Sequence, residues 1–493
     1  MLTPLPGSKW NYEKAAHLLN RAAFGGTPAQ IESAHGRGLD AILRELLDSP
    51  YEREHVLPPE WAHPRNIRAI RMALQALKED APERKNQMRE MREMEVAQAL
   101  DLRRWWLNRM ITTQNPLREK MTLFWHGHFA TSIEKVKDGY WMWLQNETLR
   151  SNAFGNFKSL TKLMSCDPAM MIYLDLQESR KEHPNENWAR ELMELFTVGI
   201  GQYSEEDIRE SARAFTGYRL DMTTQQFQFA PGQHDQTQKT FMGRTGGWSG
   251  DDVIDILMER PACAEFIARK IWRYFVEDEP SQKTIGAVAG QLRAQRYEIR
   301  PVLREIFTST EFFSESAMHS MVKSPTQFLV QTCNLLETYL PPAKMAQNAM
   351  GQMGQLLFGP PNVKGWDGGR AWVSSATLLF RYNFANYLVN GDPPRPAADA
   401  AKEKITVPAI PPPTIAETRR EPIDVGRIVP RELRDKPEEL VAHLEKRFFQ
   451  RTLPHKQSEI FTQFLLARKP GTSDETIRLL LHLMMSTPEF QLT

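Results

Sequence analysis

Apolar residues recur at the 3.6-residue spacing of an amphipathic helix over most of the chain. The pattern is clearest in residues 41–47 (AILRELL) and 265–275 (EFIARKIWRYF). Residues 78–95 depart from it, because they carry many charges and few apolar side chains. We therefore expect an all-α protein with many helices packed orthogonally and an exposed, charged helical insertion at 78–95.

Two intervals interrupt the helical pattern. Residues 225–243 alternate aromatic and polar side chains, pause at Pro231 and Gly232, and resume as a short Thr/Phe run, which predicts one small β-hairpin. Residues 359–369 (GPPNVKGWDGG) are too rich in Gly and Pro for a regular element and predict a loop. After the Gly-rich stretch that ends near residue 250, Ser249 or Asp251 is expected to cap the next helix.

The composition changes near residue 391, where the chain becomes rich in Pro and Ala up to about residue 430. Such a segment buries too little apolar surface to fold alone, so we expect a linker or a strap there. It would separate a main helical domain, residues 1–390, from a C-terminal helical unit, residues 431–493. That unit resembles residues 263–313 in its order of helix, Pro turn, helix and a closing Glu-Phe, which suggests an internal duplication.

Charge and cysteine content exclude several classes of protein. Lys and Arg number 62 against 61 Asp and Glu, so no overall field favours binding to nucleic acid. No run of apolar residues approaches the ~20 that span a bilayer, so no membrane span is expected. The three cysteines lie far apart, which argues against a disulfide framework. The first residues lack the features of an export signal, so we expect a cytoplasmic location, or export together with a partner.

Two histidines, His126 and His128, flank Gly127 at the expected end of a helix that begins at Pro116. If the helix ends at Gly127, both imidazoles can point to one place, whereas inside a helix they would diverge. Paired imidazoles suit a transition metal or acid–base chemistry. The alternative is that these histidines are buried packing residues among aromatic side chains.

An acidic row follows further along the chain. Asn187, Glu191 and Glu194 stand at i, i+4 and i+7, so they share one helix face beside an apolar stripe. Carboxylates at the edge of a core need a cation, a metal ion or hydrogen-bond donors. The alternative is a solvated helix edge that pairs with Arg190.

A third group lies in the loop of the expected hairpin. His234, Asp235 and Lys239 could place a proton acceptor, a carboxylate and a fixed charge beside a pocket. Hydrophilic hairpin loops of this composition are also common without any function.

Six motifs occur in order along the chain: LLNRAAFGGTP, FWHGHFATS, NENWARELMELFTVGIGQYSEEDIRESARAFTGY, HDQTQKTFMG, GPPNVKGWDGG followed by SATLLFRYNFA, and LMMSTPEFQL. Together they resemble the bacterial domain-of-unknown-function family number eighteen hundred over nearly the whole sequence. The resemblance implies a frequent sulfatase-like companion protein and, in many members, an export signal that this sequence lacks. It also implies that the motifs at 125–132, 187–199, 234–243 and 359–369 contribute to one site.

These observations lead to two hypotheses of function. The first is a metal-dependent enzyme, hydrolytic or redox, with a divalent metal such as zinc, iron or manganese in a central pocket. Its predicted catalytic residues are His126, His128, His234, Asp235 and Lys239, and its predicted metal ligands are His126, His128, Glu191, Glu194 and His234. The second is a non-enzymatic scaffold that binds the sulfatase-like companion through the charged insertion and the Pro-rich strap.

Overall fold

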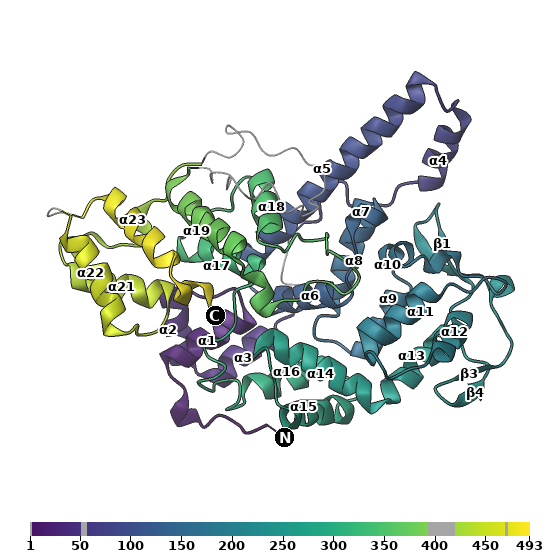
Figure 1. Cartoon of the computed structure of the whole chain (residues 1–493), viewed down its shortest axis with the longest axis horizontal. Coiled ribbons are helices and arrows are strands. Elements are labelled where there is room, and N and C mark those ends of the chain that lie inside the picture. The colour runs from purple at the N-terminus through teal and green to yellow at the C-terminus, as the bar shows by residue number, and fades with distance from the viewer. Residues whose placement is uncertain (1, 51–56, 393–419, 469–471) are drawn as a thin grey trace.

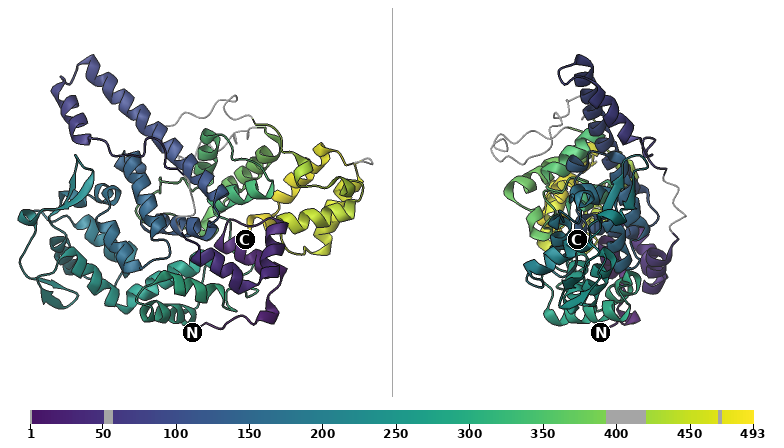
Figure 2. Two further views of the ribbon diagram at one scale, coloured as in Figure 1. Left: turned by 180° about the vertical axis from the view of Figure 1, so that it is seen from behind. Right: turned by 90° about the vertical axis from the view of Figure 1, so that its right-hand side faces the viewer.

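The computed structural model describes residues 2–50, 57–392, 420–468 and 472–493. Helices dominate these residues, as the periodicity predicted, and they form a broad body that is narrow when seen edge-on (Figures 1 and 2). The elements of the first part are η1 (Gly7–Lys9), α1 (Tyr12–Ala22), α2 (Pro28–Arg37), α3 (Leu39–Asp48), α4 (Ile67–Ala76), α5 (Pro82–Thr112), α6 (Pro116–His128), α7 (Ile133–Val136), α8 (Gly139–Ser151), α9 (Phe157–Ser165), α10 (Pro168–Tyr173) and η3 (Leu176–Glu178).

The middle part holds the strands. Its elements are α11 (Glu186–Glu191), the π-helix η4 (Leu192–Thr197), α12 (Glu205–Ala214), β1 (Tyr218–Asp221), β2 (Gln226–Phe229), η5 (Pro231–Gln233), β3 (Lys239–Phe241), β4 (Arg244–Gly246), α13 (Gly250–Glu259), α14 (Pro261–Phe275), α15 (Gln282–Ala294) and α16 (Ile299–Phe307). The last part holds α17 (Pro325–Leu335), α18 (Ala343–Gln352), η6 (Gly369–Trp372), α19 (Ser375–Asn390), η7 (Val425–Arg427), η8 (Arg431–Leu433), α21 (Pro437–Phe448), α22 (His455–Leu466), α23 (Asp474–Met485) and η9 (Pro488–Gln491).

The predicted hairpin needs a correction in its pairing. The described residues form two separate two-stranded antiparallel sheets, β1 with β2 and β3 with β4. Residues 225–243 therefore supply one strand to each sheet and do not pair with each other. The first sheet turns back at residues 222–225 and the second at residues 242–243, where Gly243 adopts a positive φ of 78°.

Local sequence explains where several helices begin. The Ser249 hydroxyl accepts a hydrogen bond from the Asp252 backbone N–H, and the Asp252 carboxylate accepts one from the Ser249 backbone N–H, so a capping box starts α13 as the sequence predicted. Thr27 and Gln30 form the same arrangement at α2. These caps satisfy backbone N–H groups that no helical carbonyl can reach.

A buried ionic network joins three long helices in the core. The Glu119 carboxylate of α6 is fully buried and accepts hydrogen bonds from Arg109 of α5 and Arg150 of α8, each at 2.7 Å. The indole of Trp106 donates to the same carboxylate at 2.8 Å. Because every charge in this network has a partner, it fixes the position of α6 beneath the site described below.

Helices α4 and α5 form an arm that projects from the body (Figures 1 and 2). Residues 78–95, the predicted charged insertion, lie at its outer end, where α5 begins and most side chains are exposed. No helix within the described ranges is both long and apolar enough to cross a membrane.

The predicted division into domains stays a prediction, since residues 393–419, most of the expected linker, lie outside the described residues. The C-terminal unit contains α21 to α23, and the segment it was predicted to duplicate contains α14 to α16. Both end in a fully buried phenylalanine, Phe490 and Phe312 respectively. Phe490 packs against Phe328 of α17, which ties the C-terminal unit to the body.

Candidate functional site

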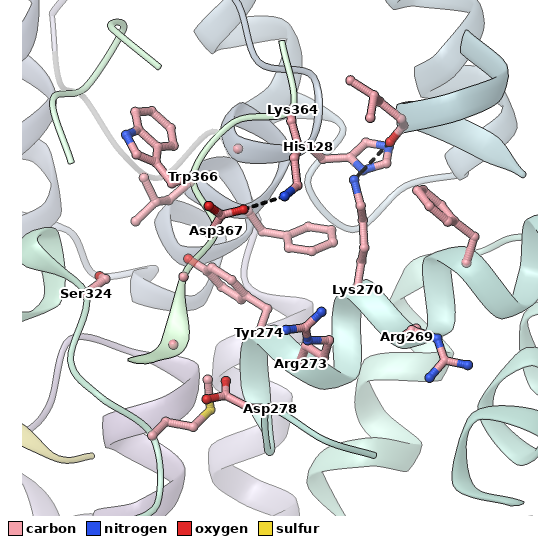
Figure 3. Close-up of a pocket in the computed structure, with 18 of the residues that line it drawn as sticks. His128, Arg269, Lys270, Arg273, Tyr274, Asp278, Ser324, Lys364, Trp366 and Asp367 are labelled. Carbon is pink, nitrogen blue, oxygen red and sulfur yellow. Dashed lines mark hydrogen bonds and ion pairs between the residues drawn. The ribbon is translucent and has the colours of Figure 1, made fainter. Parts of the chain in front are cut away.

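A cavity of about 780 Å³, called the central cavity below, is lined by residues from almost the whole length of the chain, from Asn20 to Thr493. Its wall contains residues from α1, α6, α14 and α17, the end of η4, and the loop at 359–369. Figure 3 shows the side chains that point into it, among them His128, Lys270, Tyr274 and Trp366. A cavity of this size accommodates a small-molecule ligand.

Two helices supply matching rows of side chains to this wall. Lys120, Phe124 and His128 recur every four residues on α6, and Phe266, Lys270 and Tyr274 do so on α14. The two helices run antiparallel here, because the Tyr274 hydroxyl donates to the Lys120 carbonyl at 3.1 Å while Lys270 contacts His128.

The amine of Lys270 and the imidazole of His128 form the most unusual contact in the cavity. Lys270 Nζ lies 3.0 Å from His128 Nδ1 and donates to the Leu195 carbonyl at 2.9 Å (Figure 3). Burial, with a smaller contribution from the charge of Lys364, lowers the pKa of Lys270 to about 7. Burial and the Lys270 charge hold the pKa of His128 well below its usual value, so the imidazole is neutral, and its Nδ1 accepts from the lysine in the tautomer that carries the ring proton on Nε2.

The carbonyl that binds Lys270 comes from an irregular helix end. Helix α11 widens into the π-helix η4, which stops before Gly199, a residue with a positive φ of 86°. Carbonyls in the last turn of a helix lack helical partners, so Leu195 O is free to accept from the lysine of α14. The segment ELMELFTVG therefore forms the part of the cavity wall that accepts a hydrogen bond from Lys270.

The loop at 359–369 covers the end of α6. Gly365, with a φ of 85°, lies so close to the carbonyl of Gly127 that a Cβ at residue 365 would stand 2.4 Å from that oxygen. This approach brings Trp366 and the ion pair between Lys364 and Asp367, 2.5 Å apart, to the cavity (Figure 3). The loop is thus ordered against α6 and forms part of the wall.

His126 and His128 do not point to one place. Helix α6 continues through Gly127 to His128, so the prediction that it ends at Gly127 is wrong. Residues two apart on a helix are separated by about 200° around the axis. His126 therefore faces the opposite side, where its Nε2 accepts from the Phe358 backbone at 3.0 Å and burial lowers its pKa to about 3.

The acidic row is divided between the cavity and its surroundings. Glu194 lines the cavity and accepts a hydrogen bond from the Tyr203 hydroxyl at 2.9 Å. Glu191 is half-buried outside the lining, and burial together with the charge of Glu194 raises its pKa. Asn187 donates to Asp175 at 3.3 Å. Of the three, only Glu194 lies at the cavity.

The third predicted group belongs to a loop network outside the cavity lining. His234 Nδ1 lies 2.9 Å from the Thr216 carbonyl, and Lys239 Nζ donates to the Asp235 carbonyl at 2.6 Å. Burial alone would raise the pKa of Asp235, but hydrogen bonds from Arg213 and Thr237 hold it below its usual value. These contacts hold the three side chains against the loop backbone, Arg213 of α12 and Thr216, away from the cavity lining.

The described residues contain no group of three or more His, Cys, Asp or Glu side chains placed to hold a metal ion. Of the predicted metal ligands, His128 and Glu194 reach the cavity wall, and His126, Glu191 and His234 do not.

Sequence reasoning did not identify Lys270 as a site residue. The spacing of apolar residues in 265–275 predicts an amphipathic helix and no site residue. The available signal was the row of Phe266, Lys270 and Tyr274, in which a lysine stands between aromatic residues at four-residue spacing. Such a row is also common on helix surfaces, where a lysine stem covers apolar neighbours.

The fold and the cavity define a mainly helical protein with a lysine–histidine pair on the wall of its pocket. The chain belongs to the family described as protein of unknown function (DUF1800), whose model matches residues 17–492. No curated protein and no solved structure matches the chain.

Proposed function

We propose that this protein is an enzyme that binds a small molecule in the central cavity and uses the amine of Lys270 for proton transfer. The observation that carries the proposal is the pairing of that amine with the neutral imidazole of His128 on the cavity wall. A base is most effective when its pKa lies near the working pH, and burial lowers the pKa of Lys270 to about 7.

The hydrogen bonds of Lys270 leave its lone pair available. In the His128 tautomer that carries its proton on Nε2, the two N–H groups of a neutral amine match the two acceptors within reach, Leu195 O and His128 Nδ1. The remaining lone pair is then available to a proton of a bound substrate. After it has accepted that proton, the ammonium keeps both hydrogen bonds and can return the proton to a leaving group.

Glu194 and the loop at 359–369 complete the proposed site. Glu194 brings a carboxylate to the same wall, and Trp366 supplies an aromatic surface for the substrate. The ion pair of Lys364 and Asp367 stands at the cavity and keeps a positive charge near Lys270, which favours its neutral form. A divalent metal is not part of this proposal, although His128 and Glu194 carry over from the predicted set.

The test is turnover in a mixture of small metabolites followed by mass spectrometry. The wild-type protein is expected to deplete at least one compound, and Lys270→Met to do so at least about 100-fold more slowly, the contribution typical of a positioned acid or base. Lys283→Met, which changes an exposed lysine of α15, is the control and should match the wild type. Equal turnover by Lys270→Met, or no turnover by any form, contradicts the proposal.

A second candidate function is partner binding through the arm of α4 and α5. The arm projects from the body and exposes the apolar side chains of Met72 and Met88, at 60% and 41% of their area (Figure 1). We propose the sulfatase-like companion as the partner. Co-purification should be lost in the double variant Met72→Asp, Met88→Asp and kept in Ile460→Asp, which alters an exposed apolar residue of α22. Unchanged co-purification of the arm variant would contradict this candidate.

A further inference from the structure

The cavity has a second charged region, two helical turns away from His128. Lys120 precedes His128 by eight residues on α6, which corresponds to about 12 Å along the helix axis. Both residues face the cavity, and Phe124 lies between them in the same row. A ligand that touches both ends must therefore be elongated.

Lys120 is buried without a counter-charge. Its side chain is only 9% exposed, and no described residue forms a hydrogen bond or an ion pair with its Nζ, which lies 5.1 Å from the ring centre of Phe24. Burial, with a smaller contribution from the charge of Arg21, lowers the pKa of Lys120 to about 7. An unpaired ammonium in such a place is unfavourable.

Arg21 of α1 adds a second buried cation to the same wall. It is 3% exposed, and its Nη2 donates to the Ala317 carbonyl at 2.5 Å. Burial lowers the pKa of Arg21 to about 9, although Asp278 and Glu277 are close enough to offset part of its charge. Among the described residues no carboxylate forms an ion pair with Lys120 Nζ, so its amine is left for a ligand.

We propose that Arg21 and Lys120 form a subsite for the carboxylate or phosphate end of an elongated substrate, whose other end reaches Lys270. A buried anion would pair with both cations and remove the cost of burying them alone. Leu123, Phe124 and Tyr274 also line the cavity, and Phe124 lies between Lys120 and His128 along α6, which suits a hydrocarbon middle. This inference rests on the proposed function only for the place of the reacting end.

Calorimetric titration with octanoate at pH 8 tests the subsite. Octanoate should bind the wild-type protein with uptake of about one proton, because Lys120 becomes charged beside the anion. Titration in buffers of different ionisation enthalpy measures this uptake. Lys120→Met should lower the affinity at least tenfold and abolish the uptake. Lys323→Met is the matched control: Lys323 is 2% exposed, burial lowers its pKa to about 7, and it lies over the Phe490 ring outside the cavity lining.

Three results would overturn the inference: no binding of octanoate to the wild type at millimolar concentration, the same affinity and proton uptake in Lys120→Met, or equal binding of the neutral 1-octanol. The proton uptake of the wild type is a readout that does not depend on the folding of any variant. Octanoate binding is also measured without turnover. If Lys270→Met loses turnover while octanoate does not bind, the proposed function stands and the anionic subsite falls.

Discussion

Substitution of Gly365 by alanine tests how the loop at 359–369 is held on α6. Two costs follow from the geometry at this residue. Its φ of 85° is unfavourable for a residue with a Cβ by about 1–2 kcal/mol. In addition, the new Cβ would stand 2.4 Å from the Gly127 carbonyl oxygen, about 1 Å closer than van der Waals contact. Displacing the loop to relieve this overlap costs a further 1–3 kcal/mol or so, the range typical of overpacking.

The matched control is Gly201→Ala. Gly201 has nearly the same φ, 81°, but a Cβ there would meet nothing within 4 Å. It therefore carries the backbone cost alone, about 1–2 kcal/mol, whereas Gly365→Ala should lose about 2–5 kcal/mol. The difference between the two variants isolates the close approach of the loop to α6.

The assay is urea unfolding followed by tryptophan fluorescence, with both variants and the wild type in one buffer. We expect Gly365→Ala to unfold at a clearly lower urea concentration than Gly201→Ala. If the unfolding free energies of the two variants agree within about 0.5 kcal/mol, the loop does not rest on Gly127 as described, and the place of Trp366 in the cavity wall loses its support.

Three further predictions concern buried polar groups. Glu119→Gln should lower the free energy of unfolding by about 3–5 kcal/mol, because it removes the buried carboxylate that Arg109 and Arg150 share; a loss below 1 kcal/mol in urea unfolding would contradict this. Because the pKa of Lys270 is lowered, the folded wild type binds fewer protons than the unfolded chain between pH 7 and 9, so its free energy of unfolding should rise with pH. In Lys270→Met this rise should be smaller by about 1 kcal/mol per pH unit. An unchanged dependence on pH would refute the lowered pKa. His126→Ala should cost about 2–4 kcal/mol through the lost hydrogen bond to Phe358 and the lost packing, and should leave the titration of Lys270 unchanged; a shift in that titration would place His126 in the site.

The sequence was informative wherever local patterns decide the structure. The 3.6-residue periodicity is confirmed by α14, and Ser249 caps α13 as its position before a helix suggested. The strands at 226–229 and 239–241 also follow their alternating pattern, but each pairs with a segment outside the expected hairpin. Strand type is a local property, whereas pairing depends on where the chain turns back.

The site was harder to predict from the sequence, because it depends on which helix faces meet in the fold. His128 and Glu194 were predicted from the chemistry of their side chains, and both lie at the cavity. The spacing of His126 and His128 could not show that the helix continues through Gly127, which sends the two rings to opposite sides. Lys270 acquires its lowered pKa from burial and from the charge of Lys364, which lies in a loop distant in the sequence, and no local pattern carries that information.

The most direct test of the central claim is the pKa of Lys270, measured by competitive acetylation of the whole protein. Trace acetic anhydride is applied from pH 5.5 to 11, and the labelled peptides are quantified by mass spectrometry with exposed Lys283 as the internal reference. We predict that acetylation of Lys270 rises with a midpoint near pH 7, as burial beside His128 requires. A midpoint near 10.4, the value for lysine in water, would contradict the account of this cavity as a proton-transfer site.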